Sequence, residues 1–147
     1  MSRCLKGGAA LTSPPLRDRT FSTSPMENQS TEKRPLAIGF LLTTSPEHQN
    51  SHTVFRLIEA LLAAGHRVSL FLMDDGIYNI VRIDSPNSPS AHLEKLIKAG
   101  LAVSLCTQSA EGRGIFEADA VSGIGWLSQH ALSRIVAGSD RFMSFGA

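Results

Sequence analysis

A cysteine stands where an apolar segment gives way to a small, polar, glycine-punctuated one. Residues 101–105 are mostly apolar and follow a glycine, which predicts a short buried strand that ends at Cys106. Thr107, Gln108 and Ser109 come next, in a segment suited to the first turn of a helix. The backbone N–H groups at a helix start favour negative charge, and therefore a thiolate. We expect Cys106 to be a nucleophile supported by these three residues.

Two observations bear on how reactive this cysteine is. Arg113 lies between Gly112 and Gly114, and it adds positive potential if the loop turns its side chain inward. A cysteine that closes an apolar strand is, however, more often a small buried hydrophobe than a reactive thiol. The residues alone leave both interpretations of Cys106 open.

Further polar residues follow the ends of other predicted strands. His48 and His52 lie in or near the loop after the first strand, on the sheet edge where Cys106 emerges. A neutral histidine there could take the thiol proton, although solvated loop histidines are the more common case. Tyr78 and Asn79 follow the second strand, where they either line a crevice or form an ordinary turn.

The sequence predicts no metal site and no bound cofactor. Asp74 and Asp75 follow a strand end, but adjacent carboxylates point in different directions and no third ligand is near them in the sequence. The five histidines show no paired metal-ligand spacing. No complete glycine-rich phosphate-binding motif occurs, since Gly112 and Gly114 lack the third glycine and its setting.

Composition narrows the class of protein. The chain has 147 residues, of which 42% are hydrophobic and 18% charged, and its net charge of +1 gives no basic excess for nucleic-acid binding. Its two cysteines, Cys4 and Cys106, make a disulfide framework improbable and indicate a reducing, cytoplasmic setting. No apolar run is long enough to span a bilayer.

The chain divides into two parts of different character. Residues 1–34 carry scattered prolines, serines and basic residues without a helical or strand period, which predicts a disordered tail. A misassigned start is the alternative, because Met26 is followed by an acidic residue; a targeting peptide fits less well. Residues 35–147 form one α/β domain.

Strand and helix patterns alternate along this domain. Strands are predicted over 36–42, 68–73, 101–106 and 141–145, and helices over 50–64, from Ser90 to 99, and from about Gly125 to 137. The helix over 50–64 is predicted to be capped by Asn50 or Ser51, and the next helix by Ser90. This alternation predicts a three-layer α/β/α sandwich around a mostly parallel sheet.

Several segments in this order resemble the DsrE/TusD-like (DsrE/DsrF) family of sulfur-relay proteins. The opening strand and its Ser/His-rich loop are similar, and so are the segments 64–71, 75–79, 103–106, 113–115 and 125–142. Each motif is short, and it is their order and spacing across nearly all of residues 35–145 that carry the resemblance. The segment before residue 34 is a departure from the family pattern.

The resemblance implies a function for Cys106. In that family the cysteine after this strand accepts a persulfide sulfur from a donor protein and passes it to an acceptor, and Cys106 falls on that position. Some branches of the family lack the cysteine. The resemblance also implies a homo-oligomer, a trimer or hexamer, or a hetero-oligomer with related subunits. We expect an intracellular sulfurtransferase without metal, cofactor, nucleic acid or membrane partner.

Two other functions remain open from the sequence. In the first, the chain is a non-catalytic oligomeric subunit in which Cys106 is buried and the sheet serves assembly. In the second, it is a flavodoxin-like module that binds a small ligand at the carboxyl edge of the sheet. Trp126, Phe142 and Phe145 gather near the chain end and add aromatic surface that favours an oligomer.

Overall fold

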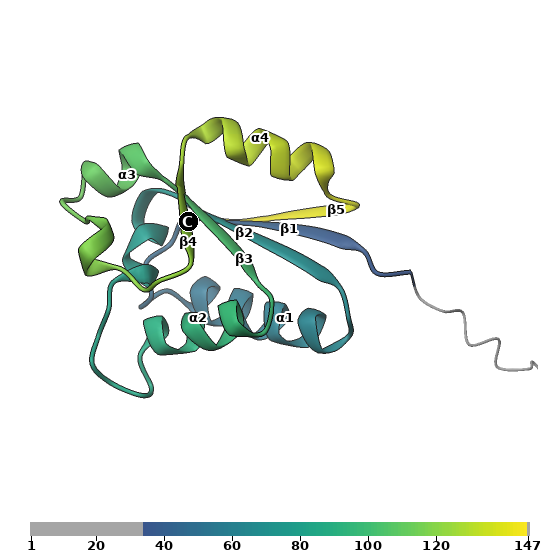
Figure 1. The fold of residues 1–147 in the computed structure, drawn as a ribbon, viewed down its shortest axis with the longest axis horizontal. Helices are drawn as coiled ribbons and strands as arrows, with labels where there is room; N and C mark the ends of the chain where they lie inside the picture. Colours follow the sequence, from purple (N-terminus) through teal and green to yellow (C-terminus); the bar gives the residue numbers. More distant parts are fainter. Residues whose placement is uncertain (1–33, 147) are drawn as a thin grey trace, which may run out of the picture. The chain divides into compact units, whose positions relative to one another are not determined.

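A computed structural model describes residues 34–146, in which five strands form one all-parallel sheet in the order β4-β3-β2-β1-β5 (Figure 1). The strands are β1 (Ala37–Leu42), β2 (Arg67–Leu72), β3 (Ala102–Cys106), β4 (Ile124–Leu127) and β5 (Arg141–Phe145). The order places the first strand inside the sheet, because β5 returns to pair with its free side. All five carboxyl ends therefore lie along the same edge.

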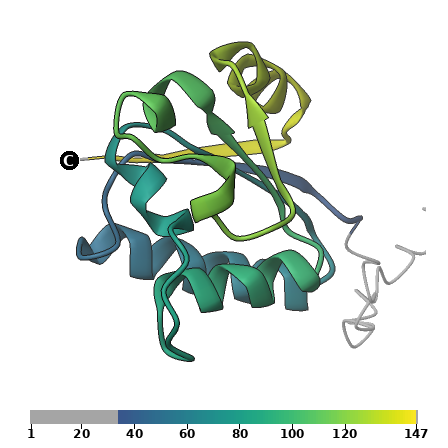
Figure 2. The same ribbon diagram turned by 60° about the vertical axis from the view of Figure 1, so that its left-hand side comes forward.

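Helices cover the two faces of the sheet unequally. Helices α1 (Gln49–Ala63) and α2 (Pro89–Lys98) pack on one face, and α4 (Gln129–Gly138) lies across the other (Figures 1 and 2). The short helix α3 (Thr107–Glu111) and the 3-10 helices η1 (Asp74–Ile80) and η2 (Glu117–Asp119) follow strand ends at the carboxyl edge. This is a three-layer α/β/α sandwich, as the sequence predicts.

Strand residues alternate between two apolar clusters. The larger cluster fills the α1/α2 side and includes the fully buried Phe40, Leu42, Ile58 and Leu70. The smaller one lies on the α4 side and consists of Phe71, Cys106 and Ala131, with Leu41, Met73, Leu132 and Ile135 packed around it. Side chains alternate across a strand, so neighbours such as Leu105 and Cys106 enter different clusters.

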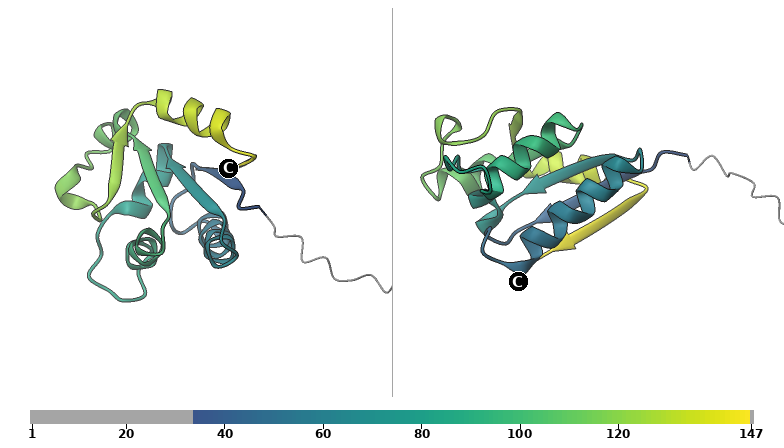
Figure 3. Two further views of the ribbon diagram at one scale, coloured as in Figure 1. Left: turned by 45° about the vertical axis from the view of Figure 1, so that its right-hand side comes forward. Right: turned by 90° about the horizontal axis from the view of Figure 1, so that it is seen from below.

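A glycine in β1 allows α4 and β5 to lie close to the sheet. A Cβ atom on Gly39 would come within 2.7 Å of Ser139 Oγ and within 2.9 Å of Ile135. Gly39 is thus needed for space, because Ile135 of α4 and Phe142 of β5 pack closely against it. Figure 3 (left) shows α4 on one side of the strands and the helices α1 and α2 on the other.

The sequence interpretation was wrong about residues 124–128. The helix predicted from about Gly125 is a strand, β4, followed by α4, which begins only at Gln129. Ile124 and Trp126 pack on the larger cluster, whereas Gly125 lines the groove beside α4. Such alternation of side chains between two sides is typical of a strand. β4 pairs with β3 in parallel, so the sheet is parallel throughout.

Helix starts also differ from the prediction. His48, rather than Asn50 or Ser51, caps α1, and its Nδ1 accepts a hydrogen bond from Asn50 N at 3.2 Å. Ser88, rather than Ser90, caps α2 by accepting from Ala91 N at 3.1 Å. Pro89 therefore occupies the first helical position, which suits its fixed φ and missing N–H.

The predicted tail falls outside the described residues, apart from its last residue. Arg34 donates a hydrogen bond to Asp140 at 3.0 Å. Within residues 34–146, no helix is both long and apolar enough to cross a bilayer.

Candidate functional site

Cys106 lies where the sequence places it, at the carboxyl end of β3. It is the last residue of the strand and the N-cap of α3, whose first residue is Thr107. Thr107 Oγ1 donates to the carbonyl of Leu127 at 3.0 Å, which holds the start of α3 against the end of β4. Gln108 is exposed and Ser109 is half-buried on the same short helix.

The thiol is buried, as in the second of the two interpretations that the sequence left open. Cys106 is 2% exposed, and it belongs to the apolar cluster that Ala131 of α4 closes. Its side chain points to the α4 face because Leu105 before it fills the α1/α2 core. In this conformation a reagent reaches the sulfur only if α4 or the end of β3 moves.

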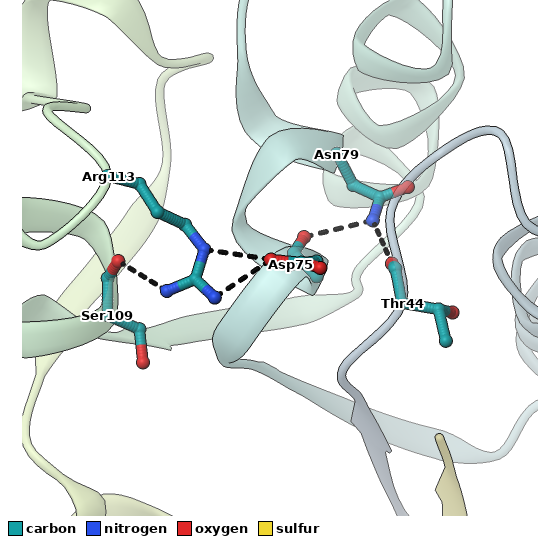
Figure 4. Close-up of polar contacts among 6 residues, drawn as sticks. Thr44, Asp75, Asn79, Ser109 and Arg113 are labelled. Carbon is teal, nitrogen blue, oxygen red and sulfur yellow. Dashed lines mark hydrogen bonds and ion pairs between the residues drawn. The ribbon is translucent and has the colours of Figure 1, made fainter. Parts of the chain in front are cut away.

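Arg113 is engaged with a carboxylate. Its Nε and Nη2 both donate to Oδ1 of Asp75, at 3.1 and 2.8 Å, and its Nη1 donates to the carbonyl of Ser109 at 3.1 Å (Figure 4). The loop does turn this side chain inward. Its charge, however, is balanced by Asp75, so its contribution is to join α3 to η1.

Asn79 connects η1 to the loop after β1. Its Nδ2 donates to the carbonyls of Thr44 and Gly76, at 3.0 and 2.9 Å, and the side chain is completely buried (Figure 4). Ser51 Oγ donates to the same Thr44 carbonyl at 3.1 Å, which ties the first turn of α1 to this junction. Asn79 is therefore a buried structural link, whereas its neighbour Tyr78 is 41% exposed.

The predicted histidines do not meet the cysteine. His48 caps α1 and is exposed, and His52 lies on α1, which covers the face opposite Cys106 and α4. His52 and Asn79 do line one pocket, located between α1 and α2. A Cys106–His52 pair is excluded in this conformation. Among residues 34–146, no three His, Cys, Asp or Glu side chains are grouped to hold a metal ion.

Sequence reasoning did not identify the residues at the switch point of the sheet. The order β4-β3-β2-β1-β5 reverses direction between β1 and β5, which is where open α/β sheets form their ligand crevice. Here Thr43 N donates to Phe145 O at 3.0 Å, and Asn50 Nδ2 donates to Gly146 O at 2.9 Å. These two bonds bridge the carboxyl ends of β1 and β5. To predict these two bonds from the sequence, one would have had to know that β5 lies beside β1 in the sheet.

Three features define the class of protein as a DsrE-like α/β domain: the all-parallel sheet, the single helix on one face, and the cysteine that ends β3. Residues 37–145 match the model of the DsrE/DsrF-like family, and the chain belongs to that family.

Two solved structures share the fold. The chain is 22% identical to the YchN protein of E. coli, with a TM-score of 0.68 over 75% of this chain and 99% of YchN. It is 16% identical to MTH1491 of Methanobacterium thermoautotrophicum, described as a protein of unknown function, with a TM-score of 0.61 over 72% of this chain and 96% of that one.

Two archaeal sequences are related. The chain is 27% identical over 109 residues to the uncharacterized protein MJ0989 of Methanocaldococcus jannaschii, covering 71% of this chain and 96% of that protein. It is 28% identical over 100 residues to the uncharacterized protein MK0008 of Methanopyrus kandleri, covering 66% of this chain and 83% of that protein.

Proposed function

We propose that the chain is a sulfur carrier in which Cys106 receives a sulfane sulfur from a donor protein and passes it to an acceptor protein. The observation that carries this proposal is the position of Cys106 at the junction of β3 and α3 in a DsrE/DsrF-like domain. It is also the one cysteine among the described residues. The setting is a reducing compartment such as the cytoplasm.

The transfer is a thiol–disulfide type of exchange. The Cys106 thiolate attacks the outer sulfur of a donor persulfide, forming a new S–S bond while the donor S–S bond breaks and the donor leaves as a thiolate. The proton of the donor persulfide stays with the transferred sulfur, and no oxidant or reductant is consumed. In the second step, an acceptor thiolate attacks the outer sulfur of the Cys106 persulfide and Cys106 leaves as a thiolate, so atoms and electrons balance in the same way. The exchange therefore requires only an accessible Cys106 thiolate.

The burial of Cys106 adds a step before this chemistry. Ala131, Leu132 and Ile135 of α4 close the cluster around the sulfur. Seven of the ten α4 residues are nevertheless exposed, so the helix rests on the sheet through one narrow side. We propose that docking of the donor displaces α4, which exposes the sulfur only while a partner is bound.

A second candidate function rests on the same burial. A thiol that is 2% exposed also suits a non-catalytic subunit whose cysteine is part of the packing. In that case the chain assembles with copies of itself, as a trimer or hexamer, or with related subunits. Light scattering of the purified protein tests assembly, since a monomer at micromolar concentration contradicts it.

Sulfur loading separates the two functions. After incubation with a protein persulfide donor, we expect the intact mass to rise by about 32 Da, the mass of one sulfur, with the addition on Cys106. Cys4→Ser is the control and keeps the addition, whereas Cys106→Ser loses it. Loading of Cys106→Ser to the same extent as Cys4→Ser contradicts the carrier function and leaves the assembly subunit.

A further inference from the structure

A groove of about 960 Å³ lies between α4 and the sheet, on the face that this single helix covers (Figure 1). Short strand residues form its floor, among them Ser69, Ser104 and Gly125. One stripe of α4 forms its wall and includes, at helical spacing, Ala131, Arg134 and Ile135. The volume lies within the range of small-ligand sites.

Ser104 is a buried polar residue of this floor. It is 9% exposed, and its hydroxyl makes no hydrogen bond with another residue of the described range 34–146. Its neighbours Val103 and Leu105 enter the larger cluster, so its side chain points to the α4 side, where its Cβ lies beside Gly125. A nearly buried hydroxyl that lines a groove in this state is explained by a polar group bound there.

The side chains that line the groove make it basic. Arg67 and Arg134 form no ion pair or hydrogen bond through their side chains within residues 34–146. His66 accepts a hydrogen bond at Nδ1 from Leu36 N at 3.2 Å, so the neutral ring carries its proton on Nε2 and can donate it. None of the described residues that line the groove is Asp or Glu.

One carboxylate lies beside the groove. Asp140 follows the lining residue Ser139, and it accepts hydrogen bonds from Ala37 N at 2.8 Å and from Arg34 at 3.0 Å. The bond from Ala37 N lowers the pKa of this carboxyl, and nearby arginines, Arg67 among them, lower it further. Asp140 thus offsets part of the positive charge at the amino edge of the sheet, whereas the guanidinium on α4 has no acid bonded to it.

The floor of the groove leads to Cys106. Ser104 and Cys106 are two residues apart on β3, so both side chains point to the α4 side and their Cα atoms lie about 7 Å apart. Ala131 belongs both to the wall of the groove and to the cluster around the sulfur. Leu127, the partner of Cys106 in the sheet register, lines the same groove. A molecule bound along the floor therefore has the thiol cluster at one end.

We propose that this groove binds a small thiol persulfide that bears carboxylates and that Cys106 takes a sulfur from it, an inference that rests on the carrier function proposed above. The carboxylates pair with Arg67 and Arg134, and the Ser104 hydroxyl bonds a polar group of the same molecule. The Cys106 thiolate attacks the outer sulfur, the S–S bond of the small persulfide breaks, and its thiol leaves as a thiolate. The proton stays on the transferred sulfur, so no oxidant or reductant is consumed.

Binding is tested with S-methylglutathione, which bears two carboxylates and whose blocked sulfur cannot exchange. Two-dimensional NMR of the full chain follows the backbone amides of Ser104, Gly125 and Arg134 during the titration. We expect saturable shifts, and at least about tenfold weaker binding of the diester, in which both carboxylates are masked. Arg134→Gln should weaken binding several-fold, whereas Arg56→Gln, on α1 and outside the lining, should leave it unchanged.

Equal binding of the acid and its diester overturns the proposal, and so do equal effects of the two arginine variants. The absence of saturable shifts also overturns it, and this is the result expected if a second copy of the chain covers the groove.

Sulfur transfer is measured by intact mass in the Cys4→Ser chain. Glutathione persulfide should add about 32 Da to Cys106, and S-methylglutathione should slow this addition by competing for the groove. Loading by a protein persulfide but not by glutathione persulfide overturns the proposal and leaves the carrier function standing. Failure of both donors to load Cys106 overturns the carrier function, and the proposed route with it.

Discussion

Arg113 donates two hydrogen bonds to a single oxygen of Asp75, at 2.8 and 3.1 Å, and thereby joins the end of α3 to η1. Asp75 is 62% exposed and Arg113 25%, so water screens the pair. We expect a double-mutant cycle of Arg113→Gln and Asp75→Asn, measured by urea unfolding, to give a coupling below about 1 kcal/mol. A coupling above about 2 kcal/mol would show that the pair is effectively buried.

The thiol of Cys106 should react slowly with alkylating reagents in the native protein. In a Cys4→Ser background, alkylation followed by mass spectrometry reports Cys106 alone. Leu132→Ala removes a side chain that packs on the Cys106 cluster, so it should speed alkylation by loosening α4. Val136→Ala, at a position 45% exposed on the same helix, is the control and should leave the rate close to wild type. Equal rates in the two variants would mean that α4 does not control access.

The start of η1 requires a glycine for reasons of space. A Cβ on Gly76 would collide with the carbonyl oxygen of Leu42, a backbone atom that cannot turn aside. We expect Gly76→Ala to lower the free energy of unfolding by about 2 kcal/mol or more, since η1 must move away from the end of β1. Gly138→Ala is the matched control, because nothing lies within 4 Å of its added Cβ. That variant, at the end of α4, should be neutral or stabilising by up to about 1 kcal/mol. Similar unfolding midpoints for both alanine variants would be inconsistent with this clash.

Burial lowers the pKa of His92 below its ordinary value of 6.5, against an opposing effect of the Glu59 carboxylate. The folded state thus binds this proton less readily than the unfolded state. The contribution of neutral His92 to stability is complete above about pH 6.5 and is lost as the pH falls through the lower, folded pKa. Urea unfolding of wild type should show decreasing stability as the pH falls below about 6.5, and His92→Gln should show a smaller decrease. Parallel pH profiles for the two proteins would contradict this origin of the effect.

The strands that the sequence predicts well are those with continuous apolar runs. β1 and β3 are recognisable because both faces of these central strands are covered. Their sequences are therefore nearly continuous apolar runs, without alternating polar residues. β4 has four residues, includes Gly125, and stands at the edge of the sheet, so its pattern is too short to distinguish from a helix start.

The candidate site was predictable in position but not in exposure. The end of β3 follows from the apolar run before Cys106, whereas the burial of the sulfur depends on α4. The position of α4 depends in turn on β4, which the sequence reasoning merged with that helix. Likewise, the pocket containing His52 and Asn79 arises from the packing of two helices that local patterns cannot place relative to each other.

The position of β5 beside β1 has a consequence for synthesis on the ribosome. The two strands are about a hundred residues apart in the chain, a separation that delays their pairing. Until residues 141–145 emerge, β1 is an open edge with unpaired N–H and C=O groups, bordered by apolar side chains such as Phe40. A nascent chain of this protein therefore carries a site for wrong strand pairing that only its last strand closes, and a stalled or truncated product is the form most exposed to aggregation.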